Sequence, residues 1–70
     1  MQYASELEMK VKNVVWMMGD DFYTFQDLLN KLTERNIIAN NRYVDRVLED
    51  MIYYSWVKRY GVYFKNQPIE

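Results

Sequence analysis

Residues 44–64 read VDRVLEDMIYYSWVKRYGVYF, and this stretch contains the change of pattern that decides the fold. In its first half, aliphatic residues return every three or four positions: Val44, Val47, Leu48 and Met51, with Ile52 at the margin. That spacing is typical of one buried face of a helix. From Tyr53 onward aromatic and β-branched residues dominate, interrupted by Tyr60-Gly61. Two such runs around a short loop that ends in glycine predict a tight β-hairpin.

The register of this hairpin follows from the need to turn one face toward the core. The expected pairs are Val57 with Phe64 and Arg59 with Val62. Lys58 and Tyr63 then share the outer face. The helix before the hairpin is expected to begin after Asn40 or Asn41, because an asparagine side chain accepts hydrogen bonds from the free N–H groups of a first helical turn.

Two more helices are predicted upstream. Ser5-Glu6-Leu7-Glu8 fits a capping box, and apolar residues continue at helical spacing to Met18, so the first helix covers about residues 5 to 18. Gly19 supplies a residue that tolerates a left-handed stop. Thr24, with Asp27 three residues later, begins a second helix that ends near Arg35-Asn36. The short segment Phe22-Tyr23 is suited to the edge of a small sheet.

The composition indicates one small domain that has no disulfide or zinc site to stabilise it. We expect residues 1–66 to form it and residues 67–70 to be a C-terminal tail. The 70 residues include no cysteine and no histidine, which excludes disulfides, zinc fingers and iron–sulfur sites. No cofactor is expected. Asp20-Asp21 is interpreted as a polar turn, and no cluster of catalytic groups is evident, so we expect no enzyme.

Association with another chain is the remaining means of stabilising so small a domain. Half of the residues are hydrophobic and 17 % are aromatic. Met9 and Trp16 form a second apolar stripe on the first helix, and Tyr3 and Met17 have no certain place in the core. The stripe either covers the back of the hairpin or forms a dimer seam; the seam is favoured because exposed apolar patches mark interfaces. We expect a homodimer or a protein partner, a cytoplasmic location and no membrane contact.

The net charge of −1 is unevenly distributed. Residues 1–39 carry four basic and six acidic groups, whereas residues 40–66 carry five basic and three acidic groups. The C-terminal half therefore has a modest basic bias, which favours a polyanionic partner.

The order helix, short extended link, helix, helix, hairpin resembles the winged helix-turn-helix family of DNA-binding regulators, over about residues 7 to 65. The register resembles that family as well, at Val44, Leu48, Met51, Ser55, Trp56 and Val57, and upstream at Val14-Val15, Met18, Leu28 and Leu32. The resemblance implies an α+β winged-helix fold of three helices and a C-terminal hairpin. Ser55 stands where the family usually has glycine, so the turn after the third helix has a backbone cost. The hairpin loop is also shorter than in many wings.

The resemblance implies a sequence-specific regulator, a repressor acting as a homodimer, that binds double-stranded DNA with its third helix in the major groove. The positions expected to read bases are Asn41, Arg42, Tyr43, Asp45 and Arg46. Lys58, Arg59 and Lys65 of the hairpin are expected to contact phosphates. In the alternative interpretation, Arg42 and Arg46 are ordinary solvated residues paired with Asp45 and Asp50. The sequence pI near 5.3 and the short wing favour a second function, a protein-interaction module that docks through its aromatic surface.

Overall fold

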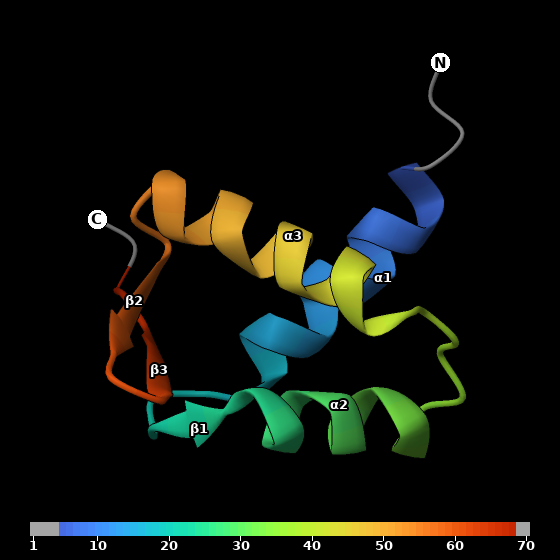
Figure 1. Cartoon of the computed structure of the whole chain (residues 1–70), viewed down its shortest axis with the longest axis horizontal. Helices are drawn as coiled ribbons and strands as arrows, with labels where there is room; N and C mark the ends of the chain where they lie inside the picture. The colour runs from blue at the N-terminus through green and yellow to red at the C-terminus, as the bar shows by residue number, and fades with distance from the viewer. Residues whose placement is uncertain (1–4, 69–70) are drawn as a thin grey trace.

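The computed structural model describes residues 5–68 and contains three helices and a small antiparallel sheet (Figure 1). The elements in chain order are α1 (Ser5–Met17), β1 (Tyr23–Thr24), α2 (Phe25–Glu34), α3 (Asn41–Tyr53), β2 (Val57–Tyr60) and β3 (Tyr63–Asn66). The predicted α+β class is confirmed, and the layout is consistent with that of a winged helix. Within residues 5–68, no helix combines the length and the apolar character needed to cross a bilayer.

Side-chain caps explain where α2 and α3 begin. The Thr24 hydroxyl accepts from the backbone N–H of Asp27 at 3.0 Å, and the Asp27 carboxylate accepts from the N–H of Thr24 at 3.0 Å. This is the predicted capping box. At α3 the side chain of Asn40 accepts from the N–H of Tyr43 at 2.8 Å, so Asn40 is the cap and Asn41 is the first helical residue. The side chain of Ser5 lies outside the described part of the chain.

The ends of α2 and α3 share one arrangement. Asn36 (φ 60°) and Ser55 (φ 65°) adopt the left-handed conformation, and so does Gly19 (φ 76°) after α1. The N–H of the following residue then reaches back to the last helical turn, from Ile37 to the Leu32 carbonyl at 3.0 Å and from Trp56 to the Met51 carbonyl at 2.9 Å. These bonds satisfy carbonyls that would otherwise lack a partner. The turn at Ser55 is left-handed and carries a side chain, a conformation in which residues other than glycine have a backbone cost.

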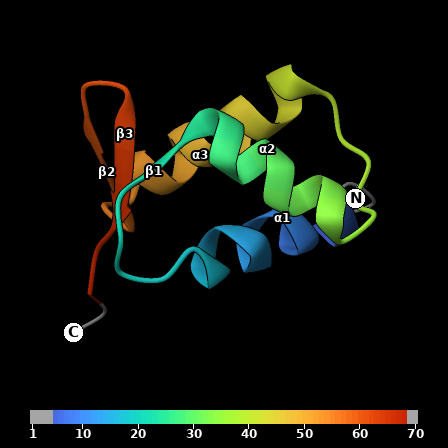
Figure 2. The same ribbon diagram turned by 90° about the horizontal axis from the view of Figure 1, so that it is seen from below.

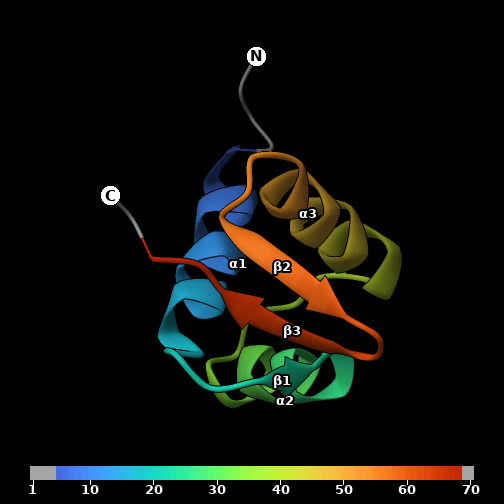
Figure 3. The same cartoon turned by 90° about the vertical axis from the view of Figure 1, so that its left-hand side faces the viewer.

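The strands form a sheet in the order β1-β3-β2, with both pairs antiparallel. Tyr23 of β1 lies opposite Phe64 and Thr24 lies opposite Tyr63. The predicted edge segment therefore joins the sheet one residue later than Phe22-Tyr23. Figure 3 shows the sheet from outside, with β2 nearest α3 and β1 nearest α2.

The predicted register of the hairpin is wrong by two residues. The observed pairs are Val57 with Asn66, Lys58 with Lys65, Arg59 with Phe64 and Tyr60 with Tyr63. The loop is Gly61-Val62 instead of Tyr60-Gly61, because the first loop residue takes a left-handed conformation (φ 64° at Gly61) that glycine adopts without strain. A shift of two residues keeps each side chain on its own face. Val57 and Phe64 therefore remain buried as predicted.

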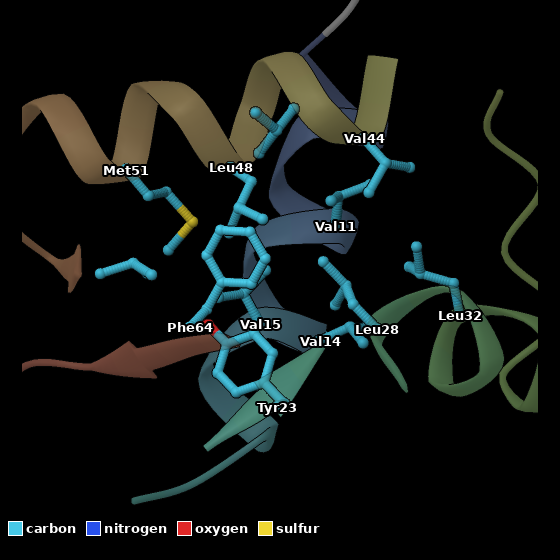
Figure 4. Packing of buried hydrophobic residues seen from close by; sticks show 12 residues of the cluster. Val11, Val14, Val15, Tyr23, Leu28, Leu32, Val44, Leu48, Met51 and Phe64 are labelled. Carbon is cyan, nitrogen blue, oxygen red and sulfur yellow. The ribbon is translucent and has the colours of Figure 1, made fainter. Parts of the chain in front are cut away.

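The core lies where the three helices meet the inner face of the sheet (Figure 4). Its members come from every element: Val11, Val14, Val15, Tyr23, Leu28, Leu32, Val44, Val47, Leu48, Met51, Val57 and Phe64. The predicted stripe of α3 is confirmed in full, with Ile52 partly buried beside it. Within the described residues, no buried residue is polar or charged apart from the hydroxyl of Tyr23.

One polar connection joins the sheet to α1. The hydroxyl of Tyr23 donates to the side-chain oxygen of Asn66 at 2.6 Å, and the side-chain NH2 of Asn66 donates to the carbonyl of Val15 at 2.8 Å. Burial raises the pKa of Tyr23 to about 12. Beyond β3 the N–H of Gln67 donates to the carbonyl of Trp56 at 2.9 Å. Residue 67 of the expected tail is thus hydrogen-bonded to the domain, while residues 69–70 lie outside the described part.

Candidate nucleic-acid interface

The outward face of α3 carries two arginines one helical turn apart. Arg42 and Arg46 are exposed, on the side of the helix away from the buried stripe. Within residues 5–68, neither guanidinium forms an ion pair or a side-chain hydrogen bond. The alternative pairing with Asp45 and Asp50 is therefore not what the structure shows. Both guanidinium groups are available to a ligand.

The other residues of α3 that are expected to read bases differ in the exposure of their side chains. Asn41 and Asp45 are exposed on the first turns of α3. Tyr43 is only partly exposed, because its ring packs against the core. Four of the five residues expected to read bases thus have exposed side chains, and Tyr43 is the exception.

The expected phosphate-contacting residues of the hairpin lie on two sides of the sheet. Arg59 turns toward α3, where its guanidinium forms an ion pair with Glu49 and lies 5.0 Å from the centre of the Phe64 ring. Glu49 belongs to the same face of α3 as Arg42 and Arg46, so Arg59 neutralises a carboxylate beside the two arginines. Lys58 and Lys65 pair across the strands on the opposite face of the hairpin.

The hairpin turn and the first turn of α3 point the same way. Figure 3 shows both segments toward its right-hand side, and in Figure 2 both lie toward the top, the hairpin turn at the left end and the first turn of α3 at the right end. The eight residues predicted to bind DNA nevertheless fall into two groups: the α3 face together with Arg59, and the outer side of the sheet with Lys58 and Lys65.

The outer side of the sheet holds a cluster that the sequence interpretation missed. We call it the outer sheet face, and its members are Phe22, Lys58, Tyr60, Tyr63 and Lys65. The ring of Phe22 lies 5.4 Å from that of Tyr60 and 6.3 Å from that of Tyr63, both edge to face. The Lys58 ammonium lies 5.5 Å from the Tyr60 ring centre, and the Lys65 ammonium lies 5.5 Å from that of Phe22. Only the observed register, which sets Tyr60 opposite Tyr63, brings these groups together.

The residues expected to form a dimer seam on α1 turn toward different neighbours. Met9 is 57 % exposed. Trp16 is partly buried and its ring lies 6.0 Å from that of Trp56. The sulfur of Met17 accepts from the Arg35 side chain at the end of α2. Tyr3 lies outside the described residues.

A second aromatic cluster follows the end of α3. We call it the C-terminal aromatic cluster, and it consists of Trp16, Tyr53, Tyr54 and Trp56. The rings of Tyr54 and Trp56 stack at 5.3 Å, while Tyr53 meets Tyr54 edge to face at 5.2 Å. Tyr53 is 81 % exposed and Tyr54 is 60 % exposed. The contact of Trp16 with Trp56, the residue before β2, agrees with the alternative in which the second stripe of α1 covers the back of the hairpin.

The described residues contain no group of three or more metal-ligating side chains. Asp20-Asp21 occupies the turn after α1, as predicted, and the carbonyl of Asp20 accepts a hydrogen bond from the Lys65 ammonium. This contact holds the turn beside the outer sheet face.

Comparisons with known proteins found no match for this chain. No family model matches the chain, and neither the curated proteins nor the solved structures give a significant match. The functional proposals below therefore rest on the side chains and contacts described above.

Proposed function

We propose that this protein is a DNA-binding protein of the winged-helix class, with the outward face of α3 in the major groove of double-stranded DNA. The observation that carries the proposal is the pair Arg42 and Arg46, exposed, one turn apart and without a protein partner in the described residues. A guanidinium binds the two acceptors of guanine in a bidentate manner, and an asparagine such as Asn41 suits adenine.

The charges on α3 indicate how much of the binding free energy would come from base contacts and how much from phosphate contacts. The helix carries two arginines and three carboxylates, of which Glu49 is paired with Arg59. Asp45 and Asp50 remain beside the arginines and would repel phosphates. We therefore propose that base contacts contribute more than phosphate contacts, with a salt slope of about −2 to −4 in a plot of log affinity against log salt concentration.

The proposed protein is a repressor that acts by occupying its site as a homodimer. Two copies reading half-sites about 34 Å apart supply contacts that one small domain lacks. Met9, exposed on the side of α1 away from the core, is the residue that best fits a contact with a second copy. Sedimentation of the wild type and of Met9→Lys tests this part, and a wild-type monomer at every concentration would contradict it.

The central experiment selects preferred duplexes from a random pool and then measures affinity by fluorescence anisotropy. Arg42→Ala/Arg46→Ala should weaken binding at least about tenfold, because each bidentate contact contributes about 1–3 kcal/mol. The matched control is Lys10→Ala/Arg35→Ala, which removes two exposed cations outside α3 and the sheet. An equal loss in the control, or no loss in the α3 variant, would reject α3 as the reading helix.

A protein-interaction module is the second candidate function, and the C-terminal aromatic cluster favours it. Three of its rings are exposed by 39–81 %, a large aromatic area for one turn of chain. Exposed apolar patches of this kind mark protein contacts. A partner that co-purifies at high salt and is lost in Trp16→Ala would favour this function over DNA binding.

A further inference from the structure

The three strands contain cations but no carboxylate. Their charged residues are Lys58, Arg59 and Lys65. Arg59 is paired with Glu49, whereas neither lysine forms an ion pair within residues 5–68. The outer sheet face therefore carries two positive charges, and none of its own side chains neutralises them. This charge is complementary to a polyanion.

The same face presents three exposed aromatic rings, and its lysine ammonium groups lie over two of them, Tyr60 and Phe22. Phe22 is 56 % exposed, Tyr63 is 49 % exposed and Tyr60 is 42 % exposed. Phe22 meets both tyrosines edge to face, so the three rings form one cluster that joins β2, β3 and the residue before β1. Aromatic side chains of this exposure offer stacking surfaces to bases, and ammonium groups beside them bind the phosphates that link those bases.

We propose that the outer sheet face is a second nucleic-acid surface, which binds an unpaired strand. Bases stack on Phe22, Tyr60 and Tyr63, while Lys58 and Lys65 contact the backbone. Unpaired bases are required because a duplex keeps the faces of its bases stacked on one another. The sequence preference is weak, since stacking is available to every base.

The size of the surface limits its affinity. The sheet has three strands with about 4.8 Å between neighbours, so the face accommodates about two or three nucleotides. Asp20 and Asp21 lie at its β1 side, where the Asp20 carbonyl accepts from Lys65. Their carboxylates repel phosphates, so the strand is expected to cross β2 and β3 and to end at Phe22 and Lys65, beside this turn.

The test measures anisotropy of a labelled oligothymidine of about 12 nucleotides at about 50 mM salt. Tyr60→Ala/Tyr63→Ala should weaken binding at least about tenfold, because each stacked base contributes substantially. Lys58→Gln/Lys65→Gln should weaken it and flatten its salt dependence. The matched control, Tyr53→Ala/Tyr54→Ala, removes two exposed tyrosines from the C-terminal aromatic cluster and should bind like the wild type.

Several outcomes would overturn the proposal. These are no binding of the oligothymidine by the wild type, an equal loss in the Tyr53→Ala/Tyr54→Ala control, or a loss in the lysine variant with none in the tyrosine variant. The last result would reduce the face to a purely electrostatic contact. Thermal melting of each variant shows whether the fold is intact, and all four tyrosines are exposed enough to be replaced without opening the core.

The proposed binding of an unpaired strand by this surface can be tested separately from the proposed binding of duplex DNA by α3. Arg42→Ala/Arg46→Ala should lose duplex affinity and keep oligothymidine affinity, and Tyr60→Ala/Tyr63→Ala should do the reverse. If each of these two variants is folded and loses both affinities, the two ligands share one surface, and the proposal of a second surface is overturned.

Discussion

The outward face of α3 and the outer sheet face carry similar numbers of cations, yet they are built differently. The α3 face comes from one helix, and its two arginines are four residues apart. The outer sheet face joins Phe22 to residues 58–65, so it exists only when the chain has closed β1 against β3. A surface within one helix depends on local periodicity, whereas a surface across strands depends on register and on long-range contacts.

The largest expected effect concerns the core that both surfaces share. Leu48 is completely buried on α3. Leu48→Ala should lower the free energy of unfolding by about 2–5 kcal/mol, because it leaves a cavity in the core. Denaturant titration measures this loss, and both binding activities should fall together. Ile38→Ala, at a site 91 % exposed, is the control and should leave stability unchanged. Survival of either activity in an unfolded Leu48→Ala protein would show that the two surfaces do not depend on a common core.

The second prediction concerns alkaline pH and the sheet. Burial raises the pKa of Tyr23 to about 12 from its ordinary 10.0, so the folded state favours the neutral phenol. The stabilisation is complete below pH 10 and is lost as the pH rises through 12, by about 2–3 kcal/mol in all. Denaturant titrations at several pH values measure it. Tyr23→Phe should be less stable at neutral pH, because it leaves the Asn66 oxygen without a donor, but it should lose less stability over this window. Equal losses in both proteins would contradict a buried phenol at this position.

A smaller effect should separate the two surfaces without unfolding either. Gly61 has φ 64°, and a Cβ added there meets open space, so Gly61→Ala acts through the backbone alone. It should destabilise the hairpin by about 1 kcal/mol. We expect the oligothymidine affinity to fall severalfold and the duplex affinity to fall less, because Arg59 is the hairpin residue that is paired with the α3 face. Val62→Ala in the same loop, at a site 72 % exposed, should change neither affinity. Equal losses on both ligands would mean that the α3 face also needs the hairpin.

The smallest predicted effect concerns Ser55, in the turn between α3 and β2. Ser55→Gly relieves a left-handed serine and should raise the free energy of unfolding by up to about 1 kcal/mol. Asn36→Gly should gain less, because asparagine tolerates this conformation better than serine. The midpoint of denaturation measures both changes. A loss of stability in Ser55→Gly would show that the serine side chain makes a contact more valuable than the relief of strain.

The helices were predictable because their signals are local. Apolar spacing gave the buried face of α3, and Thr24 with Asp27 marked the start of α2 through two hydrogen bonds three residues apart. The hairpin was predictable as an element but not in register, since Tyr60-Gly61 and Gly61-Val62 both satisfy the pattern of a short loop with glycine. The left-handed conformation of the first loop residue decides between them.

The candidate sites show the same difference between features that follow from local spacing and features that depend on long-range packing. Exposure of Arg42 and Arg46 followed from helical periodicity. The ion pair of Arg59 with Glu49 did not, because it depends on how the hairpin packs against α3. The contact of Phe22 with Tyr60 and Tyr63 was not predictable either, since Phe22 and Tyr60 are 38 positions apart in the chain and the pairing of β1 with β3 brings them together.

The side chain of Asn66 makes the molecule sensitive to chemical ageing. Its amide donates to α1 and accepts from Tyr23, and only a group with both functions can occupy that position. Deamidation would replace the NH2 by an oxygen that faces the Val15 carbonyl, two acceptors with no proton between them. A single hydrolysed amide would thus break the polar connection between the sheet and α1, while leaving their shared hydrophobic core and the two arginines of α3 in place.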